Sequence, residues 1–351
     1  MKKSFLGIPL DCVTSIMSLD EKHRTQILTE IPEELVAPFT ELREKFDMIK
    51  RDRNLIDYDD MISSASDIID TSDKVRHAVR NRFRFIFVDE YQDISEDLFR
   101  FVTRISGTDG NICAAGDDAQ SIYGFRSADI GYIVRFRKYF PNATIHMLSR
   151  NYRSKKEIVD LASLCISRNR FRIRKKIISA AGKGGSICTH PYKSDHDQYR
   201  LALEIIREEK LNGSSIAVLF RNNYQGELLR TFIRNSEKNY DLSTIEFITI
   251  HGAKGLEYDT VIILGIEDGI FPSDLSDIEE ERRLFYVAIT RAIKSLHLLY
   301  YSNAKETARF ARETFLSAGW TARRCFTGTR SVVAGIKTSS KKLFIRDHNR
   351  S

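Results

Sequence analysis

The sequence has few cysteines, few glycines at its start and no long apolar run, and each shortage excludes a class of protein. Its five cysteines are scattered and form no C-x-x-C pair, which argues against a disulfide framework and against a zinc site. Residues 1 to 80 contain a single glycine, Gly7, so a glycine-rich phosphate loop is not expected there. No stretch approaches the roughly 20 apolar residues of a membrane helix, and no signal peptide is recognisable. We therefore expect a cytoplasmic protein without a membrane partner.

Length and net charge further limit the kinds of protein that the sequence can encode. At 351 residues, with 42% hydrophobic and 29% charged residues, the chain can bury two ordinary cores. The formal net charge of +7 favours a polyanionic partner such as nucleic acid. From residue 323 onward the tail carries eight Lys and Arg against one acid, Asp347, and we expect a mobile basic extension there.

Short apolar runs of strand type alternate with helical patterns over most of the chain. The strand-type runs are 82–88, 111–116, 144–149, 215–220, 245–250, 260–266 and 295–301. Amphipathic helical patterns occupy 154–169 and 197–213, and the first 80 residues are mostly helical in pattern. Strands that alternate with helices predict parallel sheets covered on both faces, so the expected fold class is α/β.

The segment IFVDEYQDIS (86–95) runs a strand-like stretch directly into two carboxylates, Asp89 and Glu90. In parallel α/β sheets ligands gather beyond the carboxyl ends of strands. An aspartate there can hold Mg²⁺ while the following glutamate orients and deprotonates a water. For an isolated Asp-Glu pair, however, the commoner role is to begin a loop and cap the next helix.

Four further segments follow in a fixed order, and together they carry a resemblance. They are CAAGDDAQSIYGFRSAD (113–129), LSRNYRS (148–154), TIHGAKGLEYDTVIILGIEDGIFP (249–272) and EEERRLFYVAITRA (279–292). The series, with the Asp-Glu strand, resembles the UvrD/PcrA/Rep family of superfamily 1 DNA helicases from about residue 30 to residue 320. The resemblance implies two RecA-like parallel-sheet domains of the P-loop NTPase class, with ATP and Mg²⁺ as cofactors. It also implies single-stranded and duplex DNA as partners, and 3′ to 5′ movement.

The same resemblance divides the chain into four parts. Residues 1–80 would be a helical remnant of the first-domain insertion, and 81–143 the remainder of the first RecA-like domain. Residues 144–322 would form the second RecA-like domain, followed by the basic tail, 323–351.

The resemblance gives roles in ATP hydrolysis to eight residues. Asp89 would bind Mg²⁺, Glu90 would be the general base, and Gln92 would couple the nucleotide site to the DNA groove. The others are Gln120 at the γ-phosphate, Arg153 and Arg291 reaching it from the second domain, Tyr152 on the adenine and Glu257 on the ribose. Without the motifs, solvation would be the ordinary role for the two arginines, and packing for Tyr152.

The resemblance also implies DNA contacts by aromatic and basic groups, which hold single strands by stacking and by phosphate contacts. These residues are Tyr123, Phe125, Arg126, His251, Lys254 and Tyr58, with Phe125 standing where the family usually has tryptophan. For Tyr58, core packing is about as good an explanation. The basic run 168–176 could follow phosphates, although a solvated edge is the more common outcome.

Two departures from the family pattern limit what the resemblance implies. The motif G-x-x-x-x-G-K-[ST], whose backbone amides and lysine hold the β and γ phosphates, does not occur in the sequence. Only 98 positions (251 − 153) separate Arg153 from His251, where the family usually carries a large helical insertion. Two hypotheses remain. The chain is part of a helicase whose P-loop lies on a missing N-terminal piece or a separate polypeptide, or it is an ATPase-inactive single-strand-binding or regulatory remnant.

Overall fold

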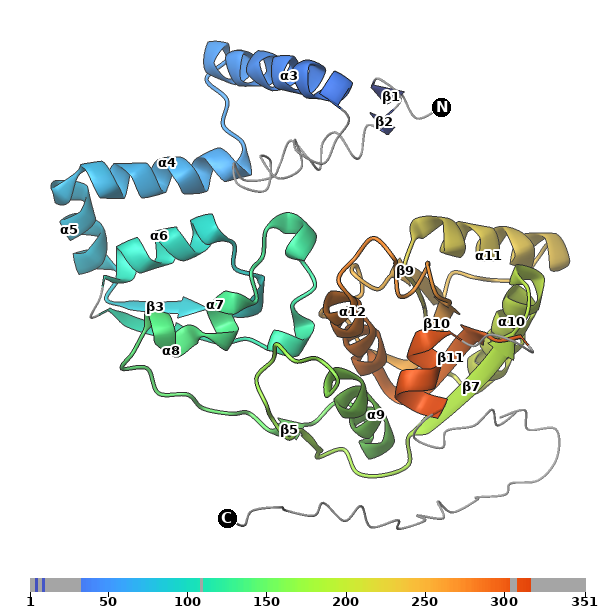
Figure 1. Ribbon diagram of the computed structural model, residues 1–351. Coiled ribbons are helices and arrows are strands. Elements are labelled where there is room, and N and C mark those ends of the chain that lie inside the picture. The colour runs from blue at the N-terminus through green and yellow to red at the C-terminus, as the bar shows by residue number, and fades with distance from the viewer. Residues whose placement is uncertain (1–3, 6–7, 10–32, 108–109, 304–307, 317–351) are drawn as a thin grey trace, which may run out of the picture.

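The computed structural model describes residues 4–5, 8–9, 33–107, 110–303 and 308–316, and Figure 1 shows two lobes built on separate parallel sheets. The predicted basic tail, 323–351, and most of the first 32 residues lie outside the described residues. Within the described part, the first element is a short antiparallel pair, β1 (Ser4–Phe5) with β2 (Ile8–Pro9). None of the described helices is long and apolar enough to cross a membrane.

Three helices precede the first parallel sheet: α3 (Glu33–Asp52), α4 (Tyr58–Thr71) and α5 (Asp73–Arg82). The first turn of α4 is fixed by a capping box in which the side chains of Asp57 and Asp60 each accept a bond from the other's backbone amide. Lys50, near the end of α3, donates to both carboxylates and ties the two helices together. The prediction of a mostly helical segment is confirmed for residues 33–82.

The first lobe contains a parallel pair of strands, β3 (Phe85–Val88) and β4 (Asn111–Ala114). One face packs against α6 (Glu96–Ser106), α7 (Gly131–Val134) and α8 (Phe136–Tyr139), through a cluster that includes Tyr91 and Val102. The opposite face is open, because Phe85 is 68% and Phe87 is 78% exposed. Parallel sheets are normally covered on both faces. This sheet therefore presents an uncovered apolar surface.

The second lobe is built on five parallel strands, whose order is β7 (Ser186–Tyr192), β11 (Ala292–Tyr301), β10 (Tyr258–Ile266), β8 (Ile216–Phe220) and β9 (Ile245–Thr249). Two helices cover one face, α9 (Lys156–Ile166) and α12 (Ile278–Thr290). Two others cover the opposite face, α10 (Asp195–Leu211) and α11 (Asn223–Ser236). The α/β class with parallel sheets is confirmed.

One strand prediction was wrong, and one strand was not predicted. Residues 144–149 form no strand, since Leu148 is 92% exposed and has no sheet neighbour to bury it. The chain instead makes a two-residue parallel pair just afterwards, β5 (Arg150–Asn151) with β6 (Ile178–Ser179). Strand β7 was missed because it carries polar residues and Pro191, which a strand tolerates at the edge of a sheet.

Candidate active site

Two exposed carboxylates stand at the carboxyl end of β3. Asp89 and Glu90 are both solvent-exposed, and the amide of Glu90 donates to Oδ1 of Asp89 at 2.8 Å. Glu90 has a left-handed backbone with φ of 49°, a conformation that costs a non-glycine residue energy and often marks a functional position. The two carboxylates are hard oxygen donors, which is what Mg²⁺ prefers.

A buried glutamine connects these carboxylates to the loop after β4. Gln92 is 0% exposed, and its amide nitrogen donates to the Glu90 carboxylate. Its Oε1 accepts from the Asp117 amide at 2.9 Å, and its backbone carbonyl accepts from Ser121 Oγ at 3.1 Å. Gln92 therefore connects Glu90, the predicted general base, to the loop that contains Asp117 and Ser121.

The loop after β4 presents Gln120 against a pair of aspartates. Asp117 accepts a 2.9 Å hydrogen bond from the side-chain amide of Gln120. Lys175, from the basic run 168–176, donates to both Asp117 and Asp118. Asp118 is 2% exposed and also accepts from the Ile173 amide at 2.9 Å. Lys175 is therefore bound within the protein, so neither explanation given for the basic run applies to this lysine.

The two predicted arginines lie at different depths in the second lobe. Arg291 is 1% exposed, and its guanidinium donates to the carbonyls of Val287 and Leu256, each at 3.0 Å. Burial, with the nearby charge of Arg153, lowers the pKa of Arg291 to about 10. Arg153 is less buried and forms an ion pair with Glu257, so two predicted nucleotide contacts are joined to each other here.

Tyr152, predicted to stack on the adenine, lies beside Arg153 in the sequence and is 73% exposed. Its face is therefore accessible to a base.

Lys254 crosses from the second lobe to the acidic end of β3. Its ammonium donates to the Asp93 carboxylate, lies 3.7 Å from Glu90, and donates to the Gln120 carbonyl at 3.1 Å. The Lys254 side chain is 8% exposed. Burial raises the pKa of Asp93 and the bond from Lys254 opposes that shift. The resemblance implies a DNA contact for Lys254, and the structure places its ammonium between the predicted catalytic groups and the Tyr123 ring, 4.8 Å from the ring centroid. Asp93 is a partner that sequence reasoning missed.

Five of the predicted DNA-binding side chains form one cluster, which includes Lys254, 4.8 Å from the centroid of the Tyr123 ring. Tyr123 and Phe125 have ring centroids 6.0 Å apart, and Arg126 lies 5.5 Å from both rings. His251 meets the Phe125 ring edge-on at 5.4 Å, and burial lowers its pKa to about 4, helped by nearby arginines. Phe125 is 55% exposed, so the cluster presents an aromatic face to solvent. Tyr58 is not one of these rings; it begins α4 and is 83% exposed.

Two family models cover these features. Residues 15–141 match the UvrD/REP helicase N-terminal domain, and residues 146–237 and 228–303 match the UvrD-like helicase C-terminal domain. The chain belongs to the UvrD/Rep helicase family.

Curated relatives of this helicase family match about half of the chain. ATP-dependent DNA helicase PcrA of Leuconostoc citreum is 32% identical over 218 residues, which is 61% of this chain and 28% of PcrA. DNA helicase II of Rickettsia typhi is 33% identical over 193 residues, 54% of this chain and 29% of the relative. The matched segments thus span less than a third of these relatives. A solved C-terminal domain of a possible DNA helicase from Lactobacillus plantarum matches at 19% identity with a TM-score of 0.32, covering 42% of this chain and 86% of that domain.

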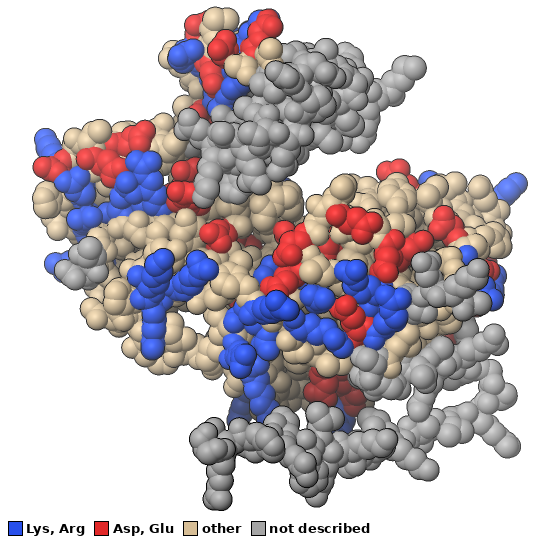
Figure 2. Space-filling model, viewed as in Figure 1, with Lys and Arg blue, Asp and Glu red and all other residues tan. Residues whose placement is uncertain are grey.

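Basic side chains of this UvrD/Rep-like chain are concentrated on one part of its surface. Figure 2 shows Lys and Arg gathered over the middle of the viewed face, around the region where α9 and α12 lie in Figure 1. Acidic side chains interrupt the basic surface.

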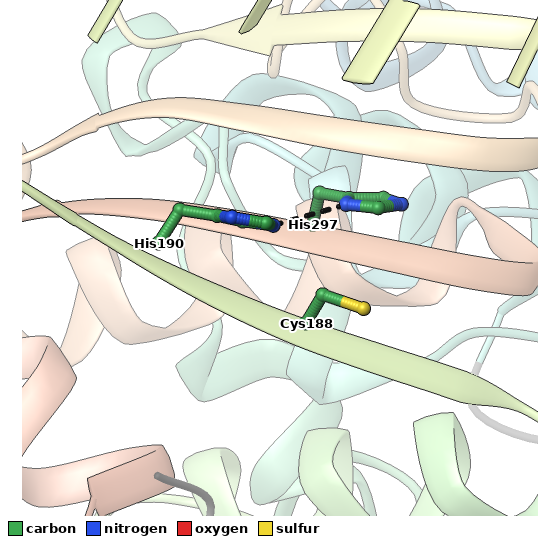
Figure 3. Close-up of side chains that lie close together, drawn as sticks. All are labelled: Cys188, His190 and His297. Atoms are coloured by element: carbon green, nitrogen blue, oxygen red, sulfur yellow. Dashed lines mark hydrogen bonds between the residues drawn. The ribbon is translucent and has the colours of Figure 1, made fainter. Parts of the chain in front are cut away.

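A buried polar cluster lies apart from the helicase motifs, on the face of the second sheet that α10 covers (Figure 3). His190 and His297 share a 3.1 Å hydrogen bond between Nε2 and Nδ1, and Cys188 lies beside them. Burial lowers the pKa of His190 to about 3, with a further contribution from His297.

Proposed function

We propose that this chain is the hydrolytic and DNA-contacting part of an ATP-dependent DNA helicase or translocase that moves on single-stranded DNA, in the 3′ to 5′ direction by its resemblance to the family. One observation carries the proposal. Groups from both lobes converge at the end of β3, where Lys254 of the second lobe lies against Glu90, Asp93 and Gln120 of the first. A site that uses both lobes can convert a change at the nucleotide into relative movement of the lobes.

The residues at the end of β3 fit the water and metal side of such a reaction. Asp89 is exposed and would hold Mg²⁺, which would neutralise charge on the phosphates. Glu90 would accept the proton of the attacking water. Its bond from Gln92 orients the carboxylate, and that bond does not require Glu90 to be protonated.

The arginines would stabilise charge on the transferring phosphoryl group, and we propose that both exchange partners as they do so. Arg153 is paired with Glu257, and Arg291 donates to Val287 and Leu256. Binding of a γ-phosphate supplies the anion that competes for these guanidinium groups. We propose that this exchange accompanies closure of the two lobes, and that Tyr152, Gln120 and Glu257 contact the rest of the nucleotide.

The cradle for the β-phosphate is not among residues 1–351, because the sequence has no G-x-x-x-x-G-K-[ST] motif. We propose that a polypeptide segment outside these residues supplies it and docks on the open face of the β3–β4 sheet. Phe85 and Phe87 make that face apolar, and the free cysteine Cys113 on β4 is exposed as well. A strand paired along the edge of this two-stranded sheet would extend it, and a helix packed on this face would cover it.

The missing motif also favours a second candidate, an ATPase-inactive module that binds single strands or regulates another helicase. The two candidates differ in what the retained carboxylates do. A general base has no task in a module that only binds DNA, so loss of Glu90 would leave that module unchanged.

The test compares hydrolysis and DNA binding in the same preparation. Mg²⁺-dependent ATP hydrolysis is measured with and without single-stranded DNA, beside Glu90→Gln, and DNA binding is measured by fluorescence anisotropy. We expect the isolated chain to bind single strands, to bind ATP weakly and to hydrolyse little. Tight Mg-ATP binding by the isolated chain would contradict the need for an external P-loop. Absence of DNA binding would contradict the first candidate and the DNA-binding form of the second.

A further inference from the structure

Three consecutive glutamates open α12, and each accepts hydrogen bonds from a different part of the chain. Glu279 and Glu281 bind parts of their own lobe: Glu279 accepts from amides in the basic run 168–176, and Glu281 accepts from Arg221. Glu280 reaches the other lobe. Its Oε1 accepts from the amide of Gly124 at 3.2 Å.

The amide that Glu280 binds lies inside the aromatic turn. Gly124–Arg126 form a single 3-10 turn, closed by a bond from the Arg126 amide to the Tyr123 carbonyl at 2.8 Å. Tyr123 and Phe125 flank the glycine directly in the sequence, and their rings meet edge-on with centroids 6.0 Å apart. Phe125 is 55% exposed, whereas Tyr123 is half-buried against the core of the second lobe. Any shift of the Gly124 amide therefore moves both rings.

The Glu280 carboxyl approaches the turn so closely that a side chain at position 124 would displace it. A Cβ at position 124 would lie 2.8 Å from Oε1 of Glu280, which is shorter than side-chain contacts allow. Burial raises the pKa of Glu280, and the bond from Gly124 together with the charge of Arg283 opposes the shift. The carboxyl is thus held against the turn rather than extended into water.

The same helix leads to the predicted nucleotide contact at its other end. Arg291 follows the last residue of α12 and is the C-cap of that helix. Eleven residues of α-helix rise about 16 Å, so one rigid element joins the two positions. Movement of Arg291 toward a phosphate would be transmitted to Glu280 along α12.

We propose that Glu280 is a positioning residue for single-stranded DNA, which fixes the Tyr123–Arg126 turn so that its rings can stack on bases and links that turn to the helix bearing Arg291. The inference rests on the proposed function and goes beyond it by naming the contact through which the second lobe controls base stacking. Bases stack on aromatic faces with about 1–3 kcal/mol each, so misplacing the rings has a measurable effect on affinity.

The experiment measures binding of the purified chain to a fluorescein-labelled oligo-thymidine by anisotropy, over a series of salt concentrations. Glu280→Ala removes the acceptor, while Glu280→Gln keeps an oxygen that can accept from the Gly124 amide. Asp277→Ala is the matched control, because it removes the same charge from the same end of α12 and its side chain caps no amide. Gly124→Ala gives an independent perturbation, since its methyl displaces the Glu280 carboxyl.

We expect Glu280→Ala and Gly124→Ala to weaken binding by about 5- to 20-fold, with an unchanged salt slope because the phosphate contacts remain. Glu280→Gln and Asp277→Ala should stay within about twofold of the wild type. If Glu280 acted only through its charge, Glu280→Ala would strengthen DNA binding, because the substitution removes a negative charge. Wild-type affinity in Glu280→Ala, or a Gln variant as weak as the Ala variant, would overturn the inference. A wild-type chain that binds no DNA would instead contradict the proposed function itself.

Discussion

Replacement of Lys175 by methionine should destabilise the protein strongly, although the residue belongs to a run that the sequence presents as a solvated edge. The ammonium donates to two carboxylates, Asp117 and Asp118. Burial alone would lower the pKa of Lys175, but the attraction of both aspartates outweighs it and raises the pKa. Methionine keeps the length and apolar volume of the stem while removing the charge.

The size of the effect follows from the burial of the three side chains. Asp118 is 2% exposed, Lys175 is 18% exposed and Asp117 is 26% exposed in the side chain. Removing one partner of a buried pair leaves an uncompensated charge, at a cost of about 3–5 kcal/mol. Because Asp117 retains some water, we take the lower end and expect about 3 kcal/mol for Lys175→Met. Asp117 would also lose its fixed orientation, so its bond from Gln120 would loosen.

The assay is urea denaturation of the purified chain, followed through the first unfolding transition. Lys176→Met is the matched control, since the next lysine in the run is exposed and should change the free energy of unfolding by less than about 0.5 kcal/mol. Combining Lys175→Met with Asp117→Asn and Asp118→Asn should recover part of the loss, because no buried charge then lacks a partner. A loss below about 1 kcal/mol in Lys175→Met would refute the reasoning.

Three other predictions follow from the site. The pKa of His190 is about 3 in the folded protein and 6.5 in the unfolded chain, so the unfolded chain gains a proton first as the pH falls. The free energy of unfolding should therefore fall below pH 6.5, by about 2 kcal/mol at pH 5. His190→Gln should reduce this loss in denaturation curves, and an unchanged dependence on pH would contradict the prediction. Phe125→Ala should weaken single-strand binding by about 5- to 100-fold without changing the slope of log affinity against log salt concentration. Arg126→Ala should instead make that slope shallower by about 0.7. Equal effects of the two variants on the slope would contradict the stacking role of Phe125. Lys254→Ala should leave the salt slope of DNA binding unchanged and lower stability by about 2 kcal/mol, because Lys254 is paired with Asp93 rather than with phosphate; a shallower slope would restore the DNA-groove role.

The elements with continuous apolar runs could be predicted from the sequence, because their pattern is local. Strand β8 (216–220) is buried at every position, and its run of aliphatic residues indicates a central parallel strand. The end of α10 was indicated by Asn-Gly, and Gly213 takes the positive φ of 70° that such a stop requires. Strand β7 lacked this signal because it lies at the sheet edge, where polar residues and proline are tolerated.

The sequence could predict which residues belong to the candidate site, but not which of them contact each other. The motifs indicated which side chains carry chemistry, since each motif is a short local pattern. The partners are far apart in the chain: Lys254 and Asp93 are separated by 161 residues, and Arg153 and Glu257 by 104. The first pair depends on how the two lobes pack, and the second on how distant segments of the second lobe meet, which periodicity and spacing do not encode. The ion pairs made by Lys175 and Lys254 were missed for this reason.

The most direct test of the central claim is ATP hydrolysis by a chain that has been given a P-loop. The segment of Leuconostoc citreum PcrA that precedes the region matching this chain is fused before α3, and DNA-stimulated hydrolysis is compared with that of the chain alone. We predict hydrolysis by the fusion, a loss of at least about 100-fold with Glu90→Gln, and no significant hydrolysis by the unfused chain. A folded fusion that binds Mg-ATP and single-stranded DNA but does not hydrolyse ATP would contradict the account, as would an unfused chain that hydrolyses as fast as the fusion.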